Sequence, residues 1–296
     1  MTGSTMQKKN YCFNSLRVSI ESDEADIIKN FDKIFGRFRA TASQKENILY
    51  TISIIYSRKN GINSEQKIYY IKRNGEVFFK TSNRSEIVPL LEWDFYKFFI
   101  GSQRDFYLIH SSVLSKNGKG YLFPGNSGKG KTTMAMKLLM KEFSYISDEV
   151  AIIDPVSLKV YPFPINLCLK EQPEKEFSEF QESFEELVCG YGDEEWSLWC
   201  IDPVEISDKI EYYPVNIDYI IFTNYSLSSK SHLDPISKSE AVLGLIKNSL
   251  NFAAFKKEGV ELLASFVKKA SCYRFTAGEM AAIDGLDDFI KQNFLI

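Results

Sequence analysis

The sequence lacks the features that define several large classes of protein. No apolar run approaches the roughly 20 residues that a membrane-spanning helix needs, so no membrane partner is expected. The first residues, MTGSTMQKKNYCFN, contain no apolar stretch typical of a secretory signal. The formal net charge is −3 and no basic stripe is present, which disfavours a nucleic-acid-binding protein.

Cysteines are few and scattered. They stand at five positions without any C-x-x-C pair: Cys12, Cys168, Cys189, Cys200 and Cys272. This spacing indicates neither a zinc site nor a disulfide framework, so we expect reduced thiols and a cytoplasmic protein. A chain of 296 residues can bury a sizeable core without disulfides, in one large domain or two unequal ones.

The first 103 residues read as a small mixed α/β unit with no evident chemistry. Apolar residues over 23–35 recur on one helical face, and Asn74-Gly75 is a hairpin turn between two β-rich runs. The expected elements are a strand over 11–23, a helix over 23–35, a strand over 46–59, a hairpin over 67–80 and a buried helix over 85–103.

The character of the sequence changes near residue 105. Strand-forming runs surround a second turn dipeptide, Asn117-Gly118, and the later segments alternate with amphipathic helices. The expected elements are a strand pair over 105–125, a helix over 131–143, a short strand over 145–154, a buried strand over 214–224 and helices over 237–252 and 256–270.

One segment differs sharply in charge from the rest. Residues 171–211 hold 14 acidic residues and 2 lysines, a local net charge of −12. Such a run is typical of a solvated acidic face or a mobile loop. The alternative is a lid that attracts a basic substrate, and the aromatic residues of YGDEEWSLW indicate that part of the segment is ordered.

A glycine-rich loop carries the strongest chemical signal. Residues 125–132, GNSGKGKT, fit the pattern G-x-x-x-x-G-K-[ST] in full, between a predicted strand and a predicted helix. Glycines let backbone N–H groups point at phosphate oxygens, and the helix start adds its positive dipole end. The lysine can reach the outer phosphates and the threonine hydroxyl can ligate Mg²⁺. We therefore expect ATP and Mg²⁺ at Gly125, Asn126, Ser127, Gly128, Lys129, Gly130, Lys131, Thr132 and Thr133.

Phosphoryl transfer needs more groups than a phosphate-binding loop. Asp148 and Glu149 end a short predicted strand, which places acid beside the loop. His110 lies in the strand that pairs toward the loop, where a histidine is either functional or a hydrogen-bonded core residue. His232 is expected to be a surface loop residue.

Three stretches together resemble the HPr kinase/phosphorylase superfamily. They are LIHSSVLSKNGKGYLFPGNSGKGKTTMAMKL, YISDEVAIID and YPFPINLCLKE, and the segments from residue 214 onward continue the likeness. The resemblance covers residues 105–290 and is strongest to the smaller HPr-kinase-like members found beside peptide-modification enzymes. It implies an α/β fold with a P-loop kinase core similar to phosphoenolpyruvate carboxykinase. The implied domains are residues 1–103, a mixed α/β unit that could recognise the acceptor, and residues 104–296, the catalytic domain.

The resemblance also implies roles for the site residues. Asp148 would act as the base on a serine hydroxyl, His110 would tune that base, and Glu149 would help to hold Mg²⁺. The basic residue after the PFP segment, Lys170, corresponds to a phosphate or transition-state contact. True HPr kinases have Asp in place of Glu149 and carry an EIRG signature that is absent here. HPr as substrate, the reverse phosphorylase reaction and the hexamer are therefore not carried over.

These observations predict an ATP- and Mg²⁺-dependent kinase. The expected acceptor is a hydroxyl, that of a serine or threonine in a peptide or protein. Two alternatives stay open: a kinase of a small-molecule alcohol, and a nucleotide-binding regulatory module that transfers no phosphate. A homo-oligomer is one option for the assembly, and pyrophosphate is an alternative phosphoryl donor to ATP.

Overall fold

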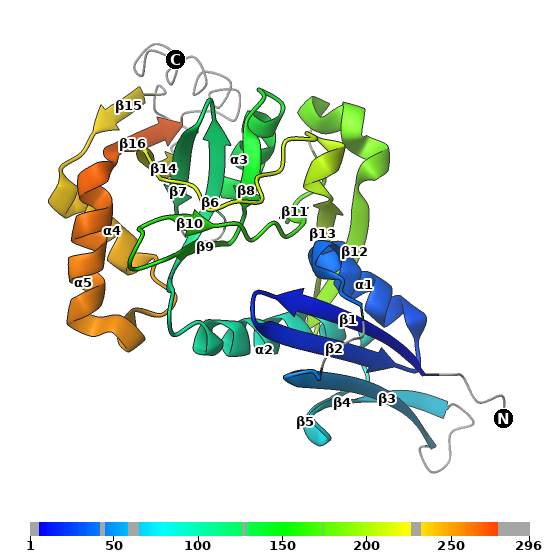
Figure 1. Ribbon diagram of the computed structural model, residues 1–296. Coiled ribbons are helices and arrows are strands. Elements are labelled where there is room, and N and C mark those ends of the chain that lie inside the picture. Colours follow the sequence, from blue (N-terminus) through cyan, green and yellow to red (C-terminus); the bar gives the residue numbers. More distant parts are fainter. Residues whose placement is uncertain are drawn as a thin grey trace. The chain divides into compact units, whose positions relative to one another are not determined.

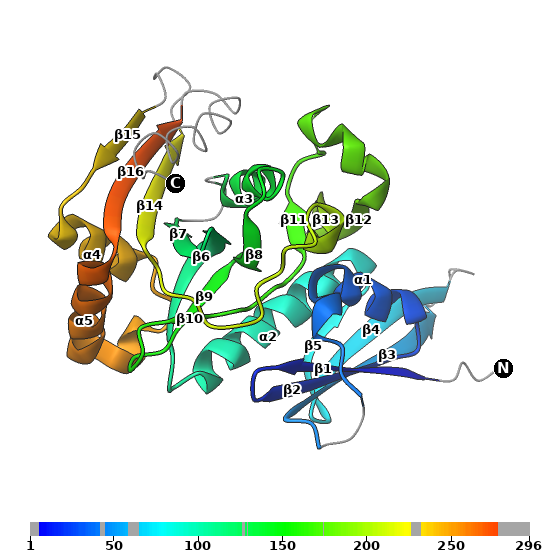
Figure 2. The same ribbon diagram turned by 45° about the horizontal axis from the view of Figure 1, so that its top comes forward.

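A computed structural model describes residues 6–41, 45–58, 65–125, 128, 130–173, 175–225 and 232–277 (Figures 1 and 2). The chain divides into two units. Unit 1 comprises Met1–Ser102 and Cys168–Ile201, and unit 2 comprises Gln103–Leu167 and Asp202–Ile296. The chain first passes from unit 1 to unit 2 between residues 102 and 103, next to the predicted boundary at 103/104. It returns to unit 1 over Cys168–Ile201 and then enters unit 2 again.

A five-stranded sheet forms the frame of unit 1. Its order is that of the sequence: β1 (Gln7–Phe13), β2 (Leu16–Ser22), β3 (Ile48–Arg58), β4 (Glu65–Arg73) and β5 (Glu76–Thr81). Strands β2 and β3 are parallel and the other neighbours are antiparallel. The single strand predicted over 11–23 is wrong, because Asn14 adopts a positive φ of 53° and the chain turns there. The predicted strand over 46–59 and the hairpin over 67–80 are confirmed.

Two helices cover one face of this sheet (Figure 1). They are α1 (Ala25–Phe35) and α2 (Ile87–Ser102), with the short 3-10 helices η1 (Gly36–Phe38) and η2 (Arg84–Glu86) beside them. Phe13 of β1 packs against Phe35 of α1 and Phe95 of α2, with ring centroids 5.4 Å and 4.3 Å away. Buried aromatic pairs of this kind anchor a core beyond their area alone. Both predicted helices are confirmed.

Buried carboxylates fasten the helices to the sheet. Asp94 of α2 accepts a hydrogen bond from the Tyr50 hydroxyl at 2.8 Å and pairs with Arg73 at 2.5 Å. Burial, followed by the contact with Asp94, raises the pKa of the Tyr50 phenol far above its usual value. The same arrangement recurs in a second trio: Tyr11, Asp32 and Arg39.

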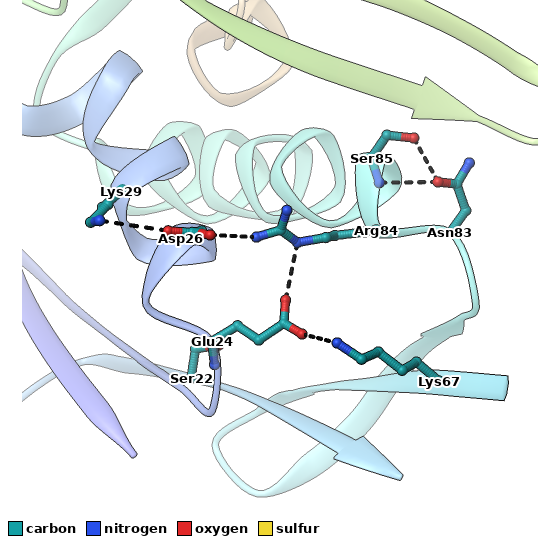
Figure 3. Close-up of polar contacts among 8 residues, drawn as sticks. All are labelled: Ser22, Glu24, Asp26, Lys29, Lys67, Asn83, Arg84 and Ser85. Carbon is teal, nitrogen blue, oxygen red and sulfur yellow. Dashed lines mark hydrogen bonds and ion pairs between the residues drawn. The ribbon is translucent and has the colours of Figure 1, made fainter. Parts of the chain in front are cut away.

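An exposed polar network surrounds the start of α1 (Figure 3). Glu24 pairs with Lys67 of β4 at 2.8 Å and with Arg84 of η2 at 3.0 Å. Arg84 also reaches Asp26 at 3.3 Å, and Asp26 lies 3.6 Å from Lys29. Since such exposed pairs contribute little individually, this network orients the helix start more than it stabilises the fold.

Most of the acidic segment belongs to unit 1. Its elements there are η3 (Lys175–Ser183), β12 (Glu185–Tyr191) and β13 (Glu194–Ile201), and the preceding strand β11 (Leu167–Leu169) completes a sheet in the order β11-β13-β12. Glu195 accepts a hydrogen bond from the Ser85 hydroxyl at 2.9 Å, and the Gly192 N–H donates to Glu86 at 2.8 Å. The prediction of a mobile loop is therefore wrong for the hairpin β12–β13, whereas the prediction that the acidic segment acts as a lid stays a prediction.

A disulfide joins two strands of this three-stranded sheet. Cys168 of β11 and Cys200 of β13 lie on neighbouring strands, with their Cα atoms 4.1 Å apart. The expectation that all five thiols are reduced is therefore wrong for this pair. Their separation of 32 residues gave no sign of pairing, because the contact depends on how β11 and β13 align. The other cysteines, Cys12, Cys189 and Cys272, are free.

Unit 2 is built on an eight-stranded sheet. Its order is β10-β9-β6-β7-β14-β16-β15, and β8 also pairs with β6. The bounds are β6 (Tyr107–Lys116), β7 (Lys119–Pro124), β8 (Ser144–Ser147), β9 (Val150–Ile153), β10 (Val160–Tyr161), β14 (Tyr219–Tyr225), β15 (His232–Pro235) and β16 (Ser271–Ala277). Strands β7, β14 and β16 are mutually parallel, which brings their carboxyl ends to one edge. The predicted strands over 105–125 and 214–224 are confirmed. The single strand predicted over 145–154 is wrong, because the chain leaves the sheet at Asp148 and Glu149 between β8 and β9. His232 is exposed as predicted, but it lies at the start of β15 and not in a loop.

Helices lie on both faces of this sheet (Figure 2). They are α3 (Lys131–Leu139) on one face and α4 (Lys238–Lys247) and α5 (Phe252–Lys269) on the other, with η4 (Pro203–Glu205) in a connection. The core between the sheet and α4–α5 contains Ile109, Leu122 and Ile220. The helices predicted over 131–143, 237–252 and 256–270 are confirmed with shifted ends. Within the described ranges, no helix has the length and apolar character needed to cross a membrane.

Candidate active site

The glycine-rich loop joins β7 to α3 at the carboxyl end of the parallel strands. This edge is where open α/β sheets hold their ligands. Gly128 and Gly130 adopt φ of +78° and +70°, values that favour glycine, and Gly130 caps α3. The N–H of Gly125 donates to the carbonyl of His110 at 3.3 Å, which fastens the loop to β6. Three predicted loop residues lie outside the described part of the chain: Asn126, Ser127 and Lys129.

The first turn of α3 presents backbone N–H groups to this edge. The first bond within the helix joins the N–H of Met134 to the carbonyl of Gly130 at 2.9 Å. The N–H groups of Lys131, Thr132 and Thr133 therefore precede the helical hydrogen bonding. Together with the helix dipole, such a turn attracts an anion such as phosphate.

Asp148 lies buried at the end of β8, with only 2% of its surface exposed. The Thr132 hydroxyl donates to its Oδ2 at 2.7 Å, and the Ser112 hydroxyl donates to its Oδ1. Burial raises the pKa of the Asp148 carboxyl, and the charge of Glu149 adds to this effect. The two hydroxyl donors and the ammonium group of Lys131 act in the opposite direction.

Glu149 points to a different set of partners. Its Oε2 lies 2.8 Å from Nε2 of His110, and the same nitrogen lies 3.3 Å from Nζ of Lys131. Glu149 has a φ of +87°, which is unfavourable for a residue with a long side chain and costs about 1–3 kcal/mol. The Ser111 N–H holds this conformation by donating to the Glu149 carbonyl at 3.2 Å. Strain of this kind is concentrated at functional sites.

The structure thus brings most of the predicted site residues together, in pairs that differ from those that the family resemblance implies. His110 contacts Glu149, and Asp148 contacts Thr132. Lys170 belongs to unit 1 and is not among the groups that unit 2 brings together. Ser112 was not predicted, although its position two residues after His110 places both side chains on the same face of β6.

The oxygen atoms at this edge suit a magnesium ion bound with a nucleotide. Thr132 and Asp148 would supply one hydroxyl and one carboxylate oxygen, and phosphate oxygens and water would complete the set. Across the ranges that the structure describes, no three His, Cys, Asp or Glu side chains converge to form a cage for a metal. Magnesium in phosphotransferase sites is held in this sparse way, through one or two carboxylates plus substrate phosphates.

Comparison with known proteins gives no independent guide to this chemistry. No family model matches the chain, and no curated protein matches it either. The inference of function therefore rests on the groups gathered around the loop of unit 2.

Proposed function

We propose that the chain is an ATP- and Mg²⁺-dependent phosphotransferase that acts on a hydroxyl group. One observation carries the proposal. A glycine-rich loop with the full phosphate-binding sequence pattern leads into helix α3. Beside it, His110 contacts both Glu149 and the buried Lys131, and Asp148 contacts Thr132 at the start of α3. The resemblance of residues 105–290 to HPr-kinase-like proteins supports the same reaction class.

Charge at the transferred phosphoryl group is offset by the loop and by Lys131. The loop N–H groups and the start of α3 provide fixed dipoles that need no reorganisation during the reaction. The ammonium group of Lys131 lies in a side chain that is only 5% exposed, so its charge is weakly screened. Positioning and electrostatic stabilisation of this kind supply most of the catalysis in phosphoryl transfer.

The metal side of the site is assigned to Thr132 and Asp148. Their oxygen atoms already lie side by side at 2.7 Å, and Ser112 fixes the other carboxylate oxygen. A bound Mg²⁺ would supply positive charge between the phosphates. Burial raises the pKa of Asp148, and the charge of the metal ion would act in the opposite direction by favouring the ionised carboxylate.

The acceptor side of the site is assigned to Glu149 and His110. The Glu149 side chain is 43% exposed, so its carboxylate can reach an incoming hydroxyl, while the 2.8 Å contact with His110 orients it. Glu149 takes the hydroxyl proton as the new P–O bond forms, and ADP leaves with the electrons of the broken bond. These roles exchange the two acids relative to the family resemblance, in which Asp148 is the base.

The proposed acceptor is a serine or threonine hydroxyl in a peptide or protein. This choice rests on the resemblance to members found beside peptide-modification enzymes. A small-molecule alcohol would use the same groups around the loop. The contribution of Lys170 to phosphate binding likewise rests on the resemblance alone.

Calorimetry followed by transfer assays tests the proposal. We expect the purified chain to bind ATP in the presence of Mg²⁺, and to transfer the γ-phosphoryl group to some members of a panel of serine- and threonine-containing peptides. The matched control is each active peptide with its acceptor replaced by alanine. ATP binding without transfer to any peptide or alcohol indicates the regulatory module instead. Absence of Mg-ATP binding overturns the proposal altogether.

A further inference from the structure

The hydroxyl of Thr223 is a buried polar group without a hydrogen-bond partner. Its Oγ1 atom is shielded from solvent, and it makes no hydrogen bond in the structure. An unpaired buried hydroxyl costs folding free energy, and native proteins rarely keep one without a reason. The position of this group indicates what that reason is.

Thr223 lies beside the phosphate-binding loop. Strand β14 is parallel to β7 in a register that pairs Tyr219 with Tyr121 and Ile220 with Leu122, and continuing it brings Thr223 next to Gly125. A Cβ atom on Gly125 would lie 3.8 Å from Thr223 Oγ1. Thr223 is also on the face opposite to Phe222, which packs with the α4–α5 core, so it shares the face that α3 covers.

The side chain of Lys131 occupies the space that Gly125 leaves open. The same Cβ position is 3.6 Å from Lys131 Cδ, so this chain lies over Gly125, next to Thr223. The Lys131 ammonium group meanwhile extends to His110, at 3.3 Å. His110 and Thr223 therefore stand on either side of Gly125, the residue over which the Lys131 side chain lies.

The contact between Lys131 and His110 is one that the ammonium group can give up. Nε2 of His110 also lies 2.8 Å from Glu149, and one ring nitrogen cannot donate to a carboxylate and accept from an ammonium group at the same time. The two contacts thus compete for one atom. The lone pairs of the Thr223 hydroxyl face no such competition.

We propose that Thr223 is a positioning residue that holds Lys131 in its phosphate-bound orientation. This inference rests on the proposed function. When a nucleotide phosphate enters the loop, the ammonium group leaves His110 and donates to both the phosphate and Thr223 Oγ1. His110 Nε2 then serves Glu149 alone, so nucleotide binding prepares the base for the acceptor. No bond other than hydrogen bonds is made or broken in this exchange.

Two substitutions at position 223 separate this role from a structural one. Thr223→Val removes the hydroxyl and keeps the branched shape, and Thr223→Ser keeps the hydroxyl. By calorimetry, we expect Thr223→Val to weaken Mg-ATP binding about tenfold, the usual effect of losing a hydrogen bond to a charged group, and Thr223→Ser to bind within about threefold of wild type. The melting temperature of ligand-free Thr223→Val should equal or exceed that of wild type, because no hydrogen bond is lost before the nucleotide binds.

A third variant tests the competition directly. His110→Ala removes the alternative partner of Lys131, so it should bind Mg-ATP as tightly as wild type or more tightly, opposite in direction to Thr223→Val. Equal affinity of Thr223→Val and wild type, or a lowered melting temperature of the ligand-free variant, overturns the role of Thr223 and leaves the proposed function intact. A wild-type protein that binds no Mg-ATP overturns both.

Discussion

Thr132 and Asp148 come from different elements, yet their side-chain oxygens lie 2.7 Å apart. Adjacent ligands of an octahedral magnesium ion, each at 2.0–2.1 Å from the metal, lie about 2.9 Å from each other. The two oxygens would therefore need to separate only slightly to admit a magnesium ion. Helix α3, which contains Thr132, and strand β8, which ends directly before Asp148, hold the pair in this relation.

Substitution of each acid tests the assignment of roles. Asp148→Asn should raise the Mg²⁺ concentration needed for half-maximal activity and weaken Mg-ATP binding, because it removes the charge beside Thr132. Glu149→Gln should bind Mg-ATP within about threefold of wild type, while turnover falls about 10²-fold or more, as expected for a lost base. Calorimetry and initial rates at several Mg²⁺ concentrations distinguish the two variants. The opposite pattern would favour Asp148 as the base and Glu149 as the metal ligand.

The raised pKa of Asp148 predicts a particular dependence of stability on pH. The folded protein holds this proton more tightly than the unfolded chain does. The resulting stabilisation is complete below the unfolded pKa of about 3.9, and it is lost as the pH rises through the raised pKa of the folded state. Asp148→Asn cannot ionise and should lack this loss. The variant's advantage in free energy of unfolding should therefore grow with pH above about 4, in urea titrations without Mg²⁺. A pH-independent difference contradicts this account.

Lys131→Ala should abolish nucleotide binding and turnover together. Without this ammonium group, the charge of the outer phosphates is poorly compensated by backbone dipoles alone. The matched control is Lys141→Ala, which removes an exposed lysine shortly after the same helix and should leave the affinity for Mg-ATP unchanged. Tight Mg-ATP binding by Lys131→Ala, measured by calorimetry, is incompatible with the proposed function.

Unit 1 should depend strongly on its buried carboxylates. Asp94→Ala leaves Arg73 and the Tyr50 hydroxyl without their partner, and breaking a buried pair in this way typically costs about 3–5 kcal/mol. Asp26→Ala breaks only the exposed contacts with Arg84 and Lys29, so it should cost less than about 1 kcal/mol. Urea denaturation of both variants gives the comparison, and similar losses would contradict it.

Chemical labelling of the free cysteine thiols tests whether the disulfide between Cys168 and Cys200 forms. Alkylation of the denatured protein without reductant should label three cysteines, Cys12, Cys189 and Cys272, and prior reduction should raise the number to five. Mass spectrometry of the labelled peptides identifies the protected pair. Because the bridge closes a loop of about 30 residues, Cys200→Ser should destabilise the folded protein by about 3–4 kcal/mol. Five labelled cysteines before reduction would show that the bridge does not form.

Local features of the sequence were reliable where one dipeptide or one short pattern decides the conformation. Asn74-Gly75 and Asn117-Gly118 have positive φ at both positions and close the two predicted hairpins. The glycine-rich loop likewise leads into a helix, as its pattern predicts. In each case the determining residues are adjacent in the chain.

Features that depend on distant contacts were not predictable in this way. The hairpin β12–β13 belongs to unit 1 because Ser85 and Glu86 bind it, more than 100 residues away in sequence. The partners of the two acids were also beyond the sequence, because the left-handed backbone of Glu149 turns its carboxylate to His110 while Asp148 stays buried. Neither the φ of Glu149 nor the hydrogen bond from the Ser111 N–H to the Glu149 carbonyl can be predicted from residue composition or motif spacing.

The division of unit 1 between two stretches of chain affects the order in which the protein can be completed during synthesis. A ribosome releases the five-stranded sheet and its helices first, but the hairpin that binds Ser85 and Glu86 follows only after Gln103–Leu167 has emerged. Domains generally fold as units from the N-terminus as they leave the ribosome. Here the early unit lacks the hydrogen bonds that Ser85 and Glu86 make with the hairpin until the first strands of the later unit have been made.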